Sequence, residues 1–115
     1  MKRSSILTLL LFLSGCTCMS GTAMNNEVRK SYYPDGKLKI VSSYENGTLN
    51  GIERRYSEEG ILKEAVNYQN GQVDGFKNTY YPDGSLWRKE LYKTGRIVER
   101  IEFDEEGRAT AEKTF

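Results

Sequence analysis

The chain has 115 residues, with 17 lysines and arginines against 16 aspartates and glutamates, and it contains no histidine. A near-neutral charge without a basic stripe argues against nucleic acid as a partner. The absence of histidine removes imidazole bases and histidine metal ligands, and with them most catalytic triads and zinc sites. A chain of this length is expected to form one domain with one modest core.

The first residues have the pattern of a secretory signal peptide. Lys2 and Arg3 give a positive start, and residues 6–13 form an apolar segment. At about 1.5 Å per residue that segment reaches about 12 Å as a helix, well short of the ~30 Å apolar core of a bilayer. We therefore predict a cleaved signal peptide at residues 1–15 rather than a membrane-spanning helix.

Residues 13–16, Leu-Ser-Gly-Cys, resemble the lipobox of bacterial lipoproteins. The resemblance implies cleavage before Cys16 and a diacylglycerol on its sulfur, and two or three acyl chains anchor a protein stably to a membrane. The protein is then expected in the cell envelope, and Thr17 favours the outer membrane, facing the periplasm, if the cell is Gram-negative. Residues 16–30 lack periodicity, and we predict that they form the lipidated cysteine and a flexible tether to a domain at residues 31–115.

A regular repeat organises the rest of the chain. The glycines of one series of turns lie at positions 36, 60, 84 and 107, so the steps are 24, 24 and 23. A second series of turns follows tyrosines at the same regular spacing, Tyr44, Tyr68 and Tyr92. In the first two copies a further glycine follows, Gly51 and Gly75, whereas the third copy has Glu99, so we expect its loop to differ.

The turn residues predict β-hairpins. Asp-Gly, Asn-Gly and Glu-Gly tolerate positive φ, and such turns between β-rich runs are the strongest short-range signal for a hairpin. The runs between turns have lengths normal for strands and alternate in character. After Gly84, alternation predicts that Arg88 and Tyr92 share one face while Trp87 lies on the other. The fold class is therefore all-β: an antiparallel sheet with one thinly covered face and one wet face.

The pattern Tyr-x-Asn-Gly-x-x-x-Gly followed by Tyr-x-x-x-Gly resembles the bacterial variant of the MORN repeat. Residues 44–60 and 68–84 match it best, residues 92–107 form a degenerate copy, and residues 32–36 resemble a leading half. The resemblance implies an array of stacked antiparallel β-hairpins, one to each step of the repeat, in an elongated, twisted single sheet. Many bacterial proteins with this variant are regarded as antitoxin components of toxin–antitoxin systems, and MORN proteins elsewhere act in binding and scaffolding.

No catalytic, cofactor-binding or metal-binding residues are predicted. The acidic clusters, such as Glu58 and Glu59, fall at turns, and a single open sheet offers no cleft in which two carboxylates could act on a sugar. Asp35 and Asp83 belong to Pro-Asp-Gly turns without a calcium-binding loop around them. We therefore expect a binding protein rather than an enzyme.

A small group of residues is predicted to contact a partner. Tyr44, Tyr68 and Tyr92 can pack as a ladder on the sheet or stack on a sugar or peptide. Trp87 stands where the other repeats have lysines; it is a candidate hot spot or packs against the last copy. Arg88 can pair with an acidic partner or lie solvated.

These features lead to two hypotheses about function. In the first, a lipoprotein held by Cys16 binds a protein partner, a toxin or another envelope protein, as an antitoxin or immunity protein. In the second, it is a structural or glycan-binding scaffold of the envelope. The sheet face and the edge strands both suit protein docking.

Overall fold

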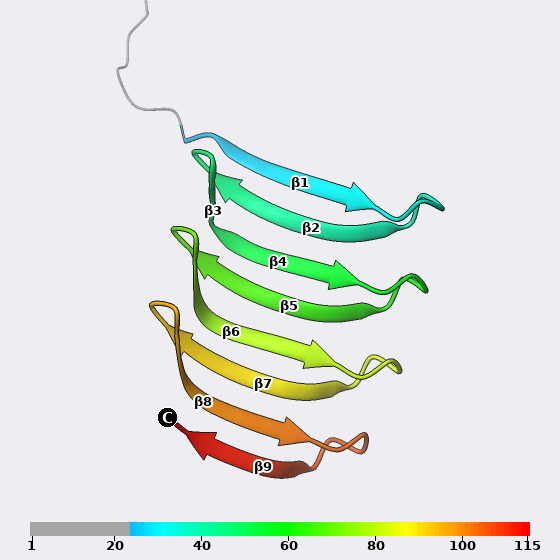
Figure 1. Ribbon diagram of the computed structural model, residues 1–115, viewed down its shortest axis with the longest axis vertical. Helices are drawn as coiled ribbons and strands as arrows, with labels where there is room; N and C mark the ends of the chain where they lie inside the picture. The colour runs from blue at the N-terminus through cyan, green and yellow to red at the C-terminus, as the bar shows by residue number, and fades with distance from the viewer. Residues whose placement is uncertain (1–23) are drawn as a thin grey trace, which may run out of the picture.

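A computed structural model describes residues 24–115 (Figure 1). It contains nine strands: β1 Asn26–Tyr32, β2 Leu38–Glu45, β3 Thr48–Leu49, β4 Gly51–Tyr56, β5 Leu62–Gln69, β6 Gln72–Tyr80, β7 Leu86–Lys93, β8 Arg96–Phe103 and β9 Ala109–Thr114. All pair antiparallel in one open sheet of order β1-β2-β4-β5-β6-β7-β8-β9, with the short β3 beside β2. The predicted all-β hairpin array is confirmed. No helix long and apolar enough to cross a membrane occurs within residues 24–115.

Strand β1 begins at Asn26, so the sheet starts before residue 31 and overlaps the predicted tether at residues 16–30. The sequence of β1 does not alternate between apolar and polar residues, which is the pattern by which a half-buried strand is recognised. In the structure all seven of its residues are exposed. Backbone pairing with β2 holds it, for example Val28 opposite Ser43. The predicted signal peptide and Cys16 lie outside the described residues.

The turns of the first series share one backbone design. The amide of Gly36 donates to the Tyr33 carbonyl oxygen at 2.9 Å, and the carboxylate of Asp35 accepts from the Lys37 amide at 2.9 Å. Aspartate is common in such turns because its carboxylate accepts a hydrogen bond from a nearby backbone amide. The aspartates of the Pro-Asp-Gly turns therefore hold the turns.

Tyrosine hydroxyls join consecutive hairpins. Tyr33 donates to the carbonyl oxygen of Tyr56 at 2.6 Å, and Tyr81 donates in the same way to Phe103 at 2.8 Å. Because each acceptor lies in the following repeat, each bond ties one hairpin to the next.

Tyr33→Phe is expected to lower the free energy of unfolding by about 1 kcal/mol, because it removes this part-buried bond and leaves the ring in place. Urea denaturation followed by circular dichroism measures the change. Tyr32→Phe is the control, since Tyr32 is 57% exposed and its hydroxyl has no bond within residues 24–115. Equal midpoints for the two variants would contradict the role of the bond.

A β-bulge follows each turn of the first series. Tyr80 pairs with Leu86 and Thr79 pairs with Arg88, so Trp87 has no partner across the strands. Lys39, Lys63 and Thr110 are skipped in the same way in the other three hairpins. A bulge redirects side chains, so simple alternation fails at these four positions.

The two faces of the sheet differ in chemistry. One, which we call the ladder face, carries a row running from Ser42 through Glu53, Val66, Lys77 and Glu90 to Arg100. The other, which we call the stripe face, carries Val41, Ile52, Ala65, Phe76, Leu91 and Ile101.

Burial is concentrated on the ladder face. Val66, at 3% exposure, is the only buried hydrophobic residue between 24 and 115. Glu53 is buried directly opposite it, and Glu90 is buried two strands away, beyond Lys77. The single layer has no conventional core, so backbone pairing and polar contacts carry much of its order.

Candidate partner-binding face

Ion pairs cross the ladder face from strand to strand. Arg55 on β4 bonds Glu64 on β5 at 2.9 Å, and Glu64 in turn accepts from the ammonium of Lys77 on β6 at 2.9 Å. Arg55 also bonds Glu53 on its own strand at 2.7 Å. The hydrogen bond from Lys77 to Glu64 raises the pKa of Lys77, so the Lys77 ammonium stays protonated at neutral pH. Two further pairs continue it, Arg88 with Glu102 and Arg100 with Glu90.

Tyrosines line the end of the ladder face beside the second series of turns, but they do not stack on one another as predicted. Gly51 pairs with Tyr68 and Gly75 pairs with Tyr92, so a glycine separates each tyrosine from the tyrosine of the preceding repeat. Successive rings are two strands apart, about 9.6 Å, too far for ring contact.

The ladder tyrosines instead meet charged neighbours. The guanidinium carbon of Arg29 lies 4.0 Å from the centre of the Tyr44 ring, a cation–π distance. Burial raises the pKa of Tyr68, so its hydroxyl stays protonated as a hydrogen-bond donor.

Trp87 lies on the same side as Arg88, contrary to the alternation expected from the sequence. The Arg88 guanidinium carbon is 4.1 Å from the centre of the Trp87 ring. The cause is the bulge, because it lets two neighbouring residues project together. Trp87 also packs on Tyr81, with ring centres 6.2 Å apart and planes tilted by 49°.

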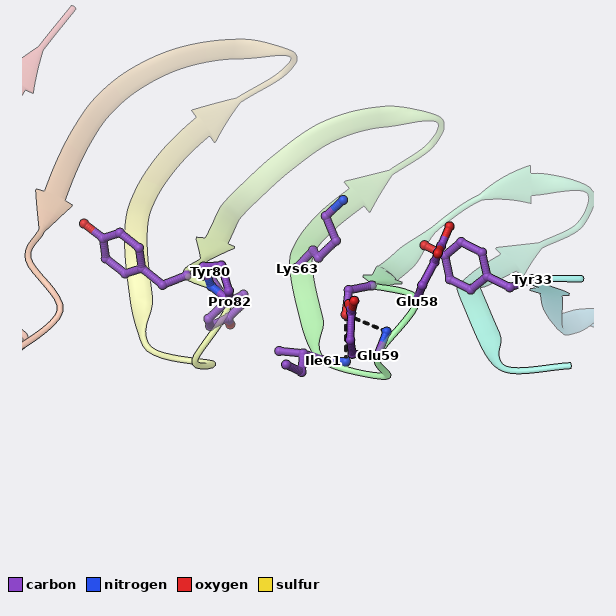
Figure 2. Close-up of a pocket in the computed structure, with 9 residues that line it drawn as sticks. Tyr33, Glu58, Glu59, Ile61, Lys63, Tyr80 and Pro82 are labelled. Carbon is purple, nitrogen blue, oxygen red and sulfur yellow. Dashed lines mark hydrogen bonds between the residues drawn. The ribbon is translucent and has the colours of Figure 1, made fainter. Parts of the chain in front are cut away.

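A hollow of about 580 Å³ opens between the turns, and Tyr81, which packs on Trp87, is one of its walls. Figure 2 shows the hollow with Tyr33, Lys63 and Pro82 among its labelled lining residues. It is lined by tyrosines, a proline, two turn glutamates and one lysine: Tyr33, Tyr80, Tyr81, Pro82, Ser57, Glu58, Glu59, Ile61 and Lys63. Aromatic walls with a few polar groups are typical of ligand-binding surfaces.

A second hollow, of about 340 Å³, adjoins the first because Tyr33 and Lys63 line both. Its remaining walls include Arg55 and Glu64 of the ladder face, so the bulged lysines project on that side. Lys63 makes no ion pair within residues 24–115, so its ammonium is available to an acidic group.

The structure brings the five candidate partner-binding residues to one face. Tyr44, Tyr68, Tyr92 and Arg88 lie on it by strand alternation, and Trp87 lies on it because of the bulge. Sequence reasoning missed Tyr33 and Lys63. Their positions in the sequence could have identified them. Tyr33 is the first residue of a turn, and Lys63 is the second residue of its strand, as Trp87 is.

Residues 24–115 contain no cluster of three or more histidine, cysteine, aspartate or glutamate residues that could hold a metal ion. The glutamates of the ladder are bonded to cations, Glu53 to Arg55 on its own strand and Glu64 and Glu90 to Lys77 and Arg100 on neighbouring strands, which suits a structural role.

The sheet defines the chain as an open array of β-hairpin repeats, a class whose repeats contact only their neighbours. The family model of the MORN repeat variant matches residues 28–46, 49–70 and 78–94. The chain therefore belongs to the MORN repeat variant family, whose all-β repeats typically serve as non-enzymatic binding modules. No curated protein matches the chain.

Proposed function

We propose that this chain is a lipid-anchored binding protein of the cell envelope whose ladder face holds a protein partner. The observation that carries the proposal is that Trp87 packs on Arg88 and on Tyr81, and that Tyr81 in turn lines the larger hollow. Tryptophan, tyrosine and arginine are the residues most enriched in binding hot spots. The cluster of Trp87, Arg88 and Tyr81 is large and lies on an open surface. We therefore expect its partner to be a protein rather than a small molecule.

The anchor is tested by cell fractionation of the full chain. Cys16→Ala is expected to move the protein from the membrane fraction to the soluble fraction, because the sulfur that would carry the lipid is lost. Cys18→Ala is the matched control and is expected to remain with the membrane. Membrane retention of Cys16→Ala would refute the anchor.

The partner-binding face is tested by affinity capture from envelope extracts, with the captured protein identified by mass spectrometry. Trp87→Ala is expected to weaken capture by about tenfold or more, the usual cost of truncating a hot spot. Tyr32→Ala provides an aromatic control on an exposed edge strand. Equal capture by all three proteins would place the interaction elsewhere.

The sharper form of the proposal is that the partner is a toxin, neutralised by direct contact as by an antitoxin or immunity protein. A strain lacking the chain is then expected to lose fitness in co-culture with its parent strain, and the wild-type chain restores it. Trp87→Ala is expected not to restore it. Full fitness of the deletion strain, together with no toxin-like protein among the captured proteins, would remove the toxin hypothesis.

A glycan-binding envelope scaffold is the second candidate, favoured by three tyrosines, Tyr33, Tyr80 and Tyr81, around one hollow. Sugar rings stack on such surfaces with little dependence on salt. Co-sedimentation with peptidoglycan that survives high salt and is lost in Trp87→Ala would favour the scaffold over the toxin hypothesis.

A further inference from the structure

The stripe face carries apolar side chains that the fold leaves uncovered. Val28, Ile52 and Phe76 occupy one position in three successive repeats and are 60%, 37% and 43% exposed. Half-buried Leu91 and Ile101 extend the stripe toward β9. A sheet normally buries one face against a second layer, and residues 24–115 supply only one layer.

The charges on the stripe face differ from those on the ladder face because none is in an ion pair within residues 24–115. In the two rows of this face that run through Lys89 and Leu91 the charges are also sorted by sign, whereas Glu45, Lys93 and Arg96 lie outside these rows, beside the second series of turns. Lys30 on β1 and Arg54 on β4 lie toward one end of the sheet, and Glu99 on β8 and Glu112 on β9 lie toward the other. Lys89 lies between the two ends, with its ammonium nitrogen 4.3 Å from the centre of the Phe76 ring.

We propose that a second copy of this chain covers the stripe face, related by a two-fold axis that runs parallel to the strands between β5 and β6. The strand order then sets β1 of one copy over β9 of the other and β2 over β8. Lys30 meets Glu112 of the second copy, and Val41 meets Ile101 of the second copy. A two-fold interface must be self-complementary. The sorting of charge along these rows meets this requirement, because the axis sets the basic end of one copy over the acidic end of the other.

The middle of the stripe fits the same arrangement. With β4 over β7, Ile52 meets Leu91 of the second copy, so the apolar residues face one another. Arg54 and Lys89 face one another with like charge, but Glu99 of the second copy lies on the next strand, about 4.8 Å away, within the reach of an arginine.

The contact area is sufficient for a stable pair. Eight strands at ~4.8 Å spacing make a face about 34 Å across, and with about 20 Å along the strands each copy offers roughly 700 Å². Two copies then bury roughly 1,400 Å² in total, within the standard range for specific interfaces. Face-to-face packing of two sheets also leaves both ladder faces open, so this dimer is independent of the proposed partner-binding function.

Sedimentation equilibrium of the full chain, purified from membranes in density-matched detergent, tests the dimer. The wild-type chain is expected to have the mass of a dimer at micromolar concentration. Lys30→Glu and Glu112→Lys, each alone, are expected to raise the dissociation constant about tenfold or more, and the double swap Lys30→Glu/Glu112→Lys is expected to restore it. Phe76→Asp is expected to give a monomer with an unchanged circular dichroism spectrum.

Lys113→Glu, an equal change of charge on the ladder face of β9, where Lys113 pairs with Arg100, is the control and is expected to remain dimeric. A monomeric wild-type chain, or a dimer that survives Phe76→Asp, would overturn the proposal. So would failure of the double swap to restore a dimer that each single change weakens. A dimer abolished by Thr110→Pro in β9, but not by stripe-face changes, would assign the contact to the sheet edges instead and overturn it as well.

Discussion

Replacing Arg100 by leucine is expected to lower the free energy of unfolding by about 3 kcal/mol, because it leaves a buried carboxylate without its main partner. Glu90 is 3% exposed and accepts two bonds from the Arg100 guanidinium, at 2.8 and 2.9 Å. Lys77 lies opposite Glu90 across the strands, but its ammonium is bonded to Glu64, so it only partly replaces the lost charge. Thermal or urea denaturation measures the loss.

The double variant Glu90→Leu/Arg100→Leu shows whether the stability lost in Arg100→Leu comes from the unpaired buried charge or from lost packing. It is expected to be within about 1 kcal/mol of the wild-type protein, since a buried ion pair often contributes little beyond an apolar pair of similar volume. Arg108→Leu is the exposed control, because the Arg108 side chain is 74% exposed, and its effect is expected to be within about 0.5 kcal/mol. If the double variant were as unstable as Arg100→Leu alone, the buried charge would not be the cause.

Gly51→Ala is expected to lower the free energy of unfolding by about 3 kcal/mol, through backbone strain and a steric clash together. Gly51 has φ +117°, and a Cβ there would lie 2.9 Å from the Cβ of Ser43 on the neighbouring strand. Because both atoms are attached to paired backbone, the clash cannot be relieved by rotating a side chain. The midpoint of urea denaturation measures the effect.

Gly60→Ala is the matched control, since φ is +89° and open space surrounds the position where its Cβ would lie. It is expected to cost about 1 kcal/mol, the strain alone. Ser43→Gly in the Gly51→Ala background is expected to recover part of the difference, because it removes the opposing Cβ. Equal losses for Gly51→Ala and Gly60→Ala would show that the close approach to Ser43 carries no energy.

The spacing of the glycines in the sequence has a physical explanation in the sheet. Where Gly51 or Gly75 is present, the strand that contains the glycine has two more residues than the strand paired with it. For example, Tyr68 pairs with Val73 while Val66 pairs with Lys77. In the third copy Tyr92 pairs with Ile97 and Leu91 with Glu99, so only one residue is extra. The last step of the repeat is therefore shorter than the others by a single bulge residue, as the loss of the glycine suggested.

The sequence by itself determined the array of hairpins, because the turn residues and the regular step of the repeat are local properties of the chain. It also placed Tyr44, Tyr68, Tyr92 and Arg88 on one face, since alternation holds wherever strands pair regularly. It revealed the likeness to the MORN repeat variant, which the family model confirms.

Only the tertiary structure decided which side Trp87 occupies and where the first strand begins. Trp87 turns toward Arg88 because a bulge, set by pairing with β6, interrupts the alternation. Residues from Asn26 onward form β1 because their backbone pairs with that of β2, although their side chains lack the alternation that predicts a strand. Pairing partners lie far along the chain, and their register depends on the assembled sheet, so no local pattern could determine these features.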